Sequence, residues 1–119
     1  MRKLAFHRLH RLLTPRDFKC VMDAPTLRAS QDGFVLLARE NSLLVARIGF
    51  VLPKRRVPHA VARNRIKRIM REAFRRQQAL LAGLDIVVMA RDGLTTHDNT
   101  ALRRAIDRQF LHLAAKRLP

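Results

Sequence analysis

Apolar residues in the first half of the chain predict one helix and two strands. The segment from Thr14 to Pro25 reads as a short helix with threonine as its N-cap, Pro15 at the first helical position and Asp17 three residues after the cap. Pro25 ends that helix. The runs FVLLA (34–38) and LLVARIGFVL (43–52) have the length of strands, and the sequence RENS between them suits a four-residue hairpin loop.

The second half predicts two helices around a buried strand. Pro58 is well placed to begin a long helix that ends at Gly83. The nearly continuous apolar run DIVVMAR, residues 85–91, is typical of a strand buried on both faces. A final packing helix, capped by Thr95 or Thr96, is predicted by apolar residues at helical spacing: Leu102, Ile106, Phe110 and Leu113.

The order helix, strand, strand, helix, strand, helix predicts an α+β fold, a two-layer α/β sandwich in which helices cover a small sheet. A chain of 119 residues makes one domain with a modest core, here residues 1–119 with a basic arm at 1–13. A parallel β-α-β connection through the long helix would ordinarily be right-handed, although the sequence itself does not decide the hand.

The net charge of the chain indicates what kind of partner it binds. The net charge is +16, far more than solubility requires, so a polyanion is the expected partner, with nucleic acid ahead of membrane lipid. Arginine dominates the 25 basic residues, and its planar fork suits phosphate oxygens. The single cysteine, Cys20, excludes an internal disulfide and is expected to be a buried apolar filler. The basic start is a poor signal peptide and the apolar runs are too short to cross a membrane, which predicts a cytoplasmic protein.

The long helix concentrates this charge on one face. At 100° per residue, one side carries apolar residues that can pack on the sheet: Ile66, Ile69, Met70, Ala73 and Phe74. The opposite side carries Asn64, Lys67, Arg68, Arg71 and Arg75. Glu72 is the only acid within reach, so this face is suited to an external anion such as a phosphate backbone. A merely solvated surface is the alternative. Asn64 could read a base edge or a 2′-hydroxyl, or make a local polar contact.

The segment KRRVPHAVARNRIKRIMREAFR resembles the signature of the bacterial ribonuclease P protein subunit, whose hallmark is an Arg-Asn-Arg segment followed by a basic helix. Here the hallmark is Arg63, Asn64 and Arg65. The agreement continues in order along nearly the whole chain, at Leu13 and Asp17-Phe18, GFV (33–35), RIGFVLPKRR, DIVVMARDG and the leucine-patterned terminal helix.

The resemblance implies an accessory protein for a catalytic RNA that removes the 5′ leader from precursor tRNA, and a sandwich with a left-handed β-α-β crossover. It implies that the basic helix and the loop before it bind the RNA subunit through Lys54, Arg55, Arg63, Asn64, Arg65, Lys67, Arg68 and Arg71, to which the helical winding adds Arg75. It also implies a cleft for the single-stranded leader between the first helix and the sheet, lined by Phe18, Met22, Val35 and Leu37.

This chain departs from the family pattern in the cleft, because some relatives carry aromatic rings where Met22 and Leu37 stand. With no Tyr or Trp in the chain, base stacking would depend on Phe18 and on arginine planes. Ordinary core packing is the alternative for Phe18. The remaining assignments to the core are Phe34, Phe50, Phe74 and Phe110.

No catalytic group is expected in the protein itself. The nine carboxylates are scattered and form no DxD or ExE pair, whereas a two-metal nuclease needs several carboxylates at one site. His7 and His10 have a spacing that could hold a metal, but no third ligand stands nearby. We expect no protein metal ligands, no organic cofactor, and Mg²⁺ held mainly by the RNA subunit.

Three other functions are weighed against this interpretation. A ribosomal-type RNA-binding protein would share the small size and the charge but would bind without regard to tRNA leaders. A protein-only nuclease is disfavoured by the scattered carboxylates. A membrane-active basic peptide is disfavoured because the fold needs the apolar face of the long helix.

Overall fold

The computed structural model describes residue 11 and residues 14–31 and 33–117; most of the predicted arm, with His7 and His10, lies outside the described residues. The elements are α1 (Pro15–Asp23), β1 (Leu27–Gln31), β2 (Phe34–Glu40), β3 (Arg47–Val51), α2 (Ala60–Gln77), β4 (Leu84–Ala90), the short 3₁₀ helix η2 (Leu94–Thr96) and α3 (Asn99–Lys116).

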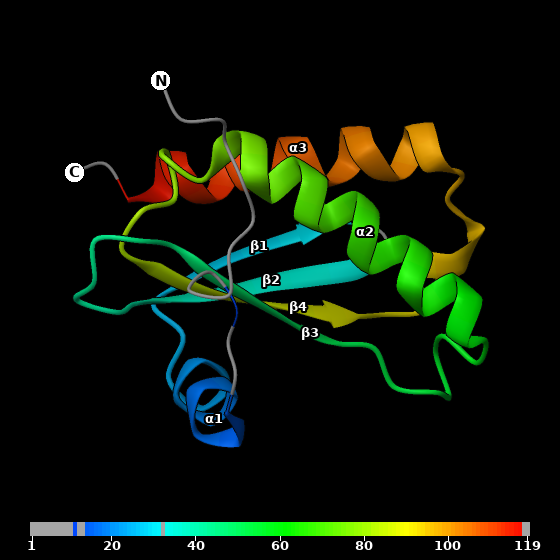
Figure 1. Cartoon of the computed structure of the whole chain (residues 1–119), viewed down its shortest axis with the longest axis horizontal. Coiled ribbons are helices and arrows are strands. Elements are labelled where there is room, and N and C mark those ends of the chain that lie inside the picture. The colour runs from blue at the N-terminus through cyan, green and yellow to red at the C-terminus, as the bar shows by residue number, and fades with distance from the viewer. Residues whose placement is uncertain (1–10, 12–13, 32, 118–119) are drawn as a thin grey trace.

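One mixed sheet organises the molecule, with the strand order β1-β2-β4-β3. The central strand β4 pairs antiparallel with β2 and parallel with β3. Helices α2 and α3 cover one face of the sheet, and α1 lies against the other face (Figure 1). The predicted α+β class is confirmed.

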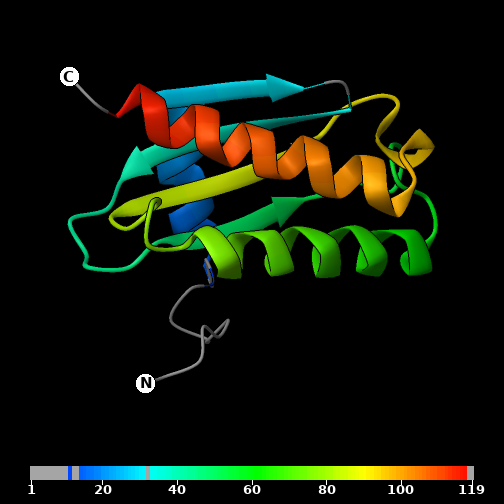
Figure 2. The same ribbon diagram turned by 90° about the horizontal axis from the view of Figure 1, so that it is seen from above.

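The β3-α2-β4 unit is left-handed. Figure 2 views the sheet from the side of α2 and α3, with β3 and β4 both running to the right. Helix α2 passes in front of the sheet, and β4 lies above β3 in that view. A right-handed unit, which is the rule for parallel connections, would place β4 below β3. The expectation from the resemblance is therefore confirmed.

The core fills the space between the sheet and the two long helices. Ile86 and Val88 of β4 point into it, together with Phe74 of α2 and Phe110 of α3, and all four side chains are fully buried. The rings of Phe74 and Phe110 meet edge to face, with centroids 6.1 Å apart. The predicted apolar face of the long helix is confirmed, since Ile66, Ile69, Met70, Ala73 and Phe74 are all buried.

The predicted hairpin between the first two apolar runs is wrong. β4 lies between β2 and β3, because a strand that is apolar on both faces is most stable at the centre of the sheet. The run predicted as a strand over 43–52 forms regular structure only over Arg47–Val51. Its first residues belong to a loop in which the Leu43 N–H donates to Asn41 Oδ1 at 2.8 Å.

Strand β1 is absent from the prediction. Ala29 is its one buried residue, so the segment offers no apolar run by which a strand could be found.

Several helix ends also differ from the prediction. Helix α2 stops at Gln77, and turns over 78–83 carry the chain to Gly83, whose φ of +85° suits glycine. Helix α3 is capped by Asp98, which accepts the Ala101 N–H at 2.7 Å, instead of by Thr95 or Thr96. Cys20 is exposed, not buried, because it lies on the outer side of α1. The capping box of Thr14 and Asp17 is confirmed.

Candidate nucleic-acid interface

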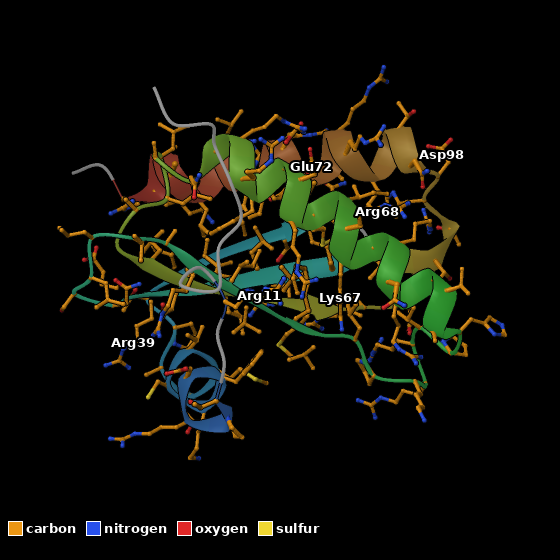
Figure 3. The ribbon with its side chains drawn as sticks, viewed as in Figure 1. Arg11, Arg39, Lys67, Arg68, Glu72 and Asp98 are labelled. Atoms are coloured by element: carbon orange, nitrogen blue, oxygen red, sulfur yellow. The ribbon has the colours of Figure 1, made fainter. Side chains whose placement is uncertain are left out.

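The outward side of α2 carries the predicted basic face. Asn64 and Arg68 are exposed, and Lys67 is half-buried where the helix approaches β3. Figure 3 shows Arg68 on α2, and it shows Lys67 and Arg11 below the helix, on the side toward the sheet. Among the residues that the structure describes, Lys67 and Arg68 have no ion-pair partner, so their charge is available to an external anion.

Four arginines assigned to this surface also make contacts within the protein. Arg63 Nη1 donates to the carbonyl oxygens of Val57 and Pro58 at 2.8 and 3.1 Å, which ties the start of α2 to the preceding loop. Arg65 Nη1 donates to Asn99 Oδ1 at 2.7 Å at the start of α3. These contacts between elements could not be predicted from helical winding.

The third is Arg75, which pairs with Glu72 at 2.7 Å. The hydrogen bond from Arg75 lowers the pKa of Glu72 below its ordinary value. The acid therefore compensates the C-terminal end of the basic face and leaves the middle positive.

Arg71 joins the basic face to the sheet. Its guanidinium lies over the ring of Phe50 at 5.3 Å from the centroid, a cation–π contact. Burial, and then the nearby charge of Arg11, lower the pKa of Arg71. A small cavity of about 150 Å³ opens here; its lining is Arg11, Phe18, Ile48, Gly49, Phe50, Lys67 and Arg71. The cavity brings Phe18 of α1 and two cations of α2 to one place.

The loop before α2 adds a second group of cations. Lys54 and Arg55 are exposed, as expected for residues that contact a partner. Arg56 forms an ion pair with Asp92 at 2.6 Å. A hollow of about 250 Å³ joins this loop to the end of the sheet; its lining is Val51, Pro53, Arg55, Arg56, Met89, Ala90 and Arg91.

A larger hollow of about 420 Å³ lies next to the hollow at the loop before α2, and Arg56 and Arg91 line both of them. Its other lining residues are Arg28, Ser30, Gln31, Gly33, Phe34, Val35 and Asp92. Sequence reasoning missed Arg28 and Arg91, because they stand far apart along the chain and only strand pairing brings them to one edge.

The four residues assigned to the leader cleft do not share one environment. Phe18 and Leu37 are half-buried and pack on Val21 and Val87 in a small apolar cluster between α1 and the sheet. Val35 is 2% exposed, whereas Met22 is 37% exposed. Phe18 thus has a packing role and also reaches the small cavity, so both interpretations of it have structural support.

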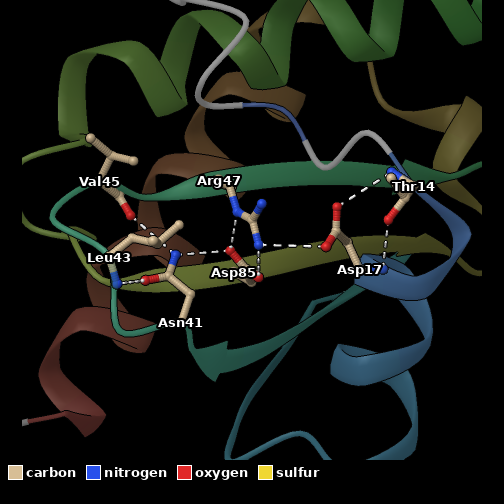
Figure 4. A network of polar contacts seen from close by, with 7 residues as sticks. All are labelled: Thr14, Asp17, Asn41, Leu43, Val45, Arg47 and Asp85. Atoms are coloured by element: carbon tan, nitrogen blue, oxygen red, sulfur yellow. Dashed lines mark hydrogen bonds and ion pairs between the residues drawn. The ribbon is translucent and has the colours of Figure 1, made fainter.

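A polar network fixes the opposite end of this sheet face (Figure 4). Arg47 binds Asp85 through two hydrogen bonds, Nε to Oδ1 at 2.8 Å and Nη2 to Oδ2 at 2.7 Å. The hydrogen bond to Asp85 is the main cause of the raised pKa of Arg47. Asn41 Nδ2 donates to the same Asp85 Oδ1 at 2.8 Å. Asp85 is thus buried and fully engaged.

The described residues contain no group of three or more His, Cys, Asp or Glu side chains that could hold a metal ion. None of the described helices is long and apolar enough to cross a membrane.

The fold and the basic face of α2 place the chain in the class of small cationic α+β proteins built on a left-handed β-α-β unit. The sequence profile of the family described as Ribonuclease P matches residues 6–114. The chain belongs to the Ribonuclease P family.

Individual relatives agree with this assignment. The chain is 48% identical over 112 residues to a ribonuclease P protein component from Pseudomonas putida, covering 94% of this chain and 84% of that protein. It is 42% identical over 113 residues to the ribonuclease P protein component from Nitrosococcus oceani, covering 95% of this chain and 94% of that protein. The solved RNase P protein of Thermotoga maritima superposes with a TM-score of 0.72 at 32% identity, covering 92% of this chain and 97% of that one.

Proposed function

We propose that this chain, as a single domain, is the protein subunit of a cytoplasmic ribonuclease P. It binds a catalytic RNA subunit and the 5′ leader of precursor tRNA, and it assists the endonucleolytic removal of that leader. The observation that carries the proposal is the juxtaposition, at one small cavity, of cations from α2 with Phe18 of α1. Family membership favours this function over the ribosomal-type and membrane-active alternatives.

The RNA subunit is assigned to the outward side of α2 and the loop before it. The principal contacts are Lys54, Arg55, Asn64 and Arg68, which are exposed, and Lys67, which is half-buried but has no ion-pair partner among the described residues. Arg63, Arg65 and Arg71 contribute positive charge while they also hold α2 to its neighbours. Arg75 contributes charge while it pairs with Glu72 on the same helix. Arginine can keep such internal bonds and still donate to phosphate, since its guanidinium carries five N–H donors.

The leader is assigned to the sheet face beside α1. Phe18 offers an aromatic ring for a base, and Arg56 and Arg91 at the two hollows can bind the leader phosphates. Met22, Val35 and Leu37 supply apolar surface around this path, with Met22 the most exposed of the three.

Mg²⁺ belongs with the RNA in this proposal. The surface assigned to RNA is cationic, so the protein side of this interface repels a divalent cation whereas the RNA phosphates attract it. The protein supplies charge and shape, and the RNA phosphates hold the ions that hydrolysis requires.

Replacing Arg68 by alanine tests the RNA-subunit surface. The change removes a forked donor from the middle of the basic face, and a charge-assisted hydrogen bond contributes roughly 1.5–3 kcal/mol. Affinity for the RNA subunit, measured by filter binding at fixed salt, should fall about tenfold or more. Arg104→Ala is the matched control, because Arg104 is an exposed arginine on α3. Equal losses for the two variants would show that α2 has no special role.

Replacing Phe18 by alanine tests the leader surface. A ring that stacks on one base contributes roughly 1–3 kcal/mol, so affinity for precursor tRNA should fall about five- to a hundredfold. Affinity for mature tRNA and for the RNA subunit should stay within about twofold, since neither contact involves the leader. The measurement is done in the reconstituted particle, with circular dichroism to confirm folding. A folded variant that loses both tRNAs equally contradicts the cleft assignment, and an unfolded one shows that Phe18 serves the core.

A further inference from the structure

Three charged residues form a row across the sheet on the face that carries α1. Arg39 of β2 is directly opposite Asp85 of β4, and Asp85 is in turn opposite Arg47 of β3. The next row toward the leader surface is apolar, with Leu37 opposite Val87. The charged row therefore borders the surface assigned to the leader and lies at the opposite end of it from Arg91.

The centre of this row is rigid. Asp85 is 7% exposed and accepts the two-pronged bond from Arg47. Asn41 ties the same carboxylate to the 41–45 loop, since its Nδ2 also donates to the Val45 carbonyl oxygen at 3.1 Å. The bonds to Asp85 thus fix the orientation of the Arg47 guanidinium independently of any contact with α1.

Each of the two arginines reaches one end of α1. Arg47 Nη2 lies 3.7 Å from Oδ1 of Asp17, in the first turn of the helix (Figure 4). Arg39 Nη1 donates at 3.3 Å to the carbonyl oxygen of Ala24, the C-cap. Between these ends, Val21 and Phe18 pack α1 on Val87 of β4, and the two arginines hold the helix at either end of this small apolar contact.

We propose that Arg47 and Arg39, with Asp85 holding Arg47, are positioning residues that set where α1 lies across the sheet and so determine the width of the leader cleft. This inference rests on the proposed function for its consequence, which is the discrimination between precursor and mature tRNA. It does not require either arginine to touch RNA. Phe18 lies one residue after Asp17, so a shift of the first turn moves the ring directly.

Asp17→Asn separates positioning from charge. Asparagine keeps an oxygen that can accept the Thr14 N–H but loses the ion pair with Arg47. Asp23→Asn is the matched control, because Asp23 is also on α1 and its removal changes the net charge equally, but its pair is Lys19 on the same helix. Asp17→Glu restores the carboxylate and should rescue the asparagine variant.

The position of α1 can be measured without RNA. Cys20 is the only cysteine and is exposed on α1, so a nitroxide label there can be paired with one at Ala115→Cys on α3. Pulsed electron–electron double resonance measures the distance between the two labels. The distribution of this distance should be broader or shifted for Asp17→Asn, and unchanged for Asp23→Asn and Asp17→Glu. An Asp17→Asn distribution identical to that of the parent overturns the proposal.

The functional readout is the ratio of affinities for precursor and mature tRNA in the reconstituted particle. Asp17→Asn should lower this ratio about three- to fivefold, as expected for a partly exposed ion pair, while Asp23→Asn leaves it unchanged. A displaced α1 with an unaltered ratio overturns the link to the leader. A parent protein that shows no preference for precursor tRNA refutes the proposed function itself, and the label distances then still decide whether Asp17 positions α1.

Discussion

Raising the monovalent salt from 50 to 200 mM will weaken binding of the RNA subunit by about 250- to 1,000-fold. The reason is that each cation neutralising a phosphate releases condensed counterions, about 0.7–0.9 per contact for single and double strands. About six engaged cations then give a slope of log affinity against log salt of roughly −4 to −5. The exposed cations Lys54, Arg55 and Arg68 can supply that number together with the half-buried cations of α2, which are Arg63, Arg65, Lys67, Arg71 and Arg75.

The salt experiment has an internal control on the same helix. Lys67→Gln should make the slope shallower by roughly 0.7–0.9, the share of one phosphate contact. Arg104→Gln on α3 should leave the slope unchanged. A parent slope near zero would mean that the contacts are not phosphate contacts, and it would remove the physical basis of the proposed function.

Asp85→Ala will cost the fold about 3 kcal/mol of unfolding free energy, the lower end of the range for breaking a buried ion pair. The loss is large because the substitution leaves Arg47 and Asn41 without their shared acceptor. It stays at the lower end because the Arg47 side chain is 23% exposed and water can solvate it in part. Urea unfolding followed by circular dichroism measures the change.

Asp92→Ala is the matched substitution for this comparison. Asp92 also pairs with an arginine, at 2.6 Å, but its side chain is 98% exposed. An ion pair of that kind contributes less than about 1 kcal/mol. Similar losses for Asp85→Ala and Asp92→Ala would show that the network around Asp85 contributes no more than an exposed pair.

Local patterns predicted the parts of the structure that depend on local physics. The capping box of Thr14 and Asp17 is complete within four residues of sequence, and the two faces of α2 follow from the helical repeat alone. Strand β4 was found because its buried run is nearly continuous. The candidate surface on α2 was predictable for the same reason.

The parts that failed depend on partners distant in the chain. Nothing in the second apolar run shows that β4 separates β3 from β2, because strand adjacency is decided when the whole sheet assembles. β1 is an edge strand with Ala29 as its buried residue, so its pairing with β2 has no sequence signal. The hydrogen bond from Arg65 to the start of α3 likewise exists only in the folded chain, and so do the hollows that Arg91 lines.

The central place of β4 sets an order of events during synthesis. β1 and β2 can pair as soon as they leave the ribosome, but β3 forms its parallel ladder only with β4, which is made after α2. The basic helix therefore emerges before the strand that completes its support, at a moment when its apolar face is uncovered. Completion of residues 84–90 closes the sheet beneath that apolar face, and α3 then completes its burial, since Phe110 packs on Phe74.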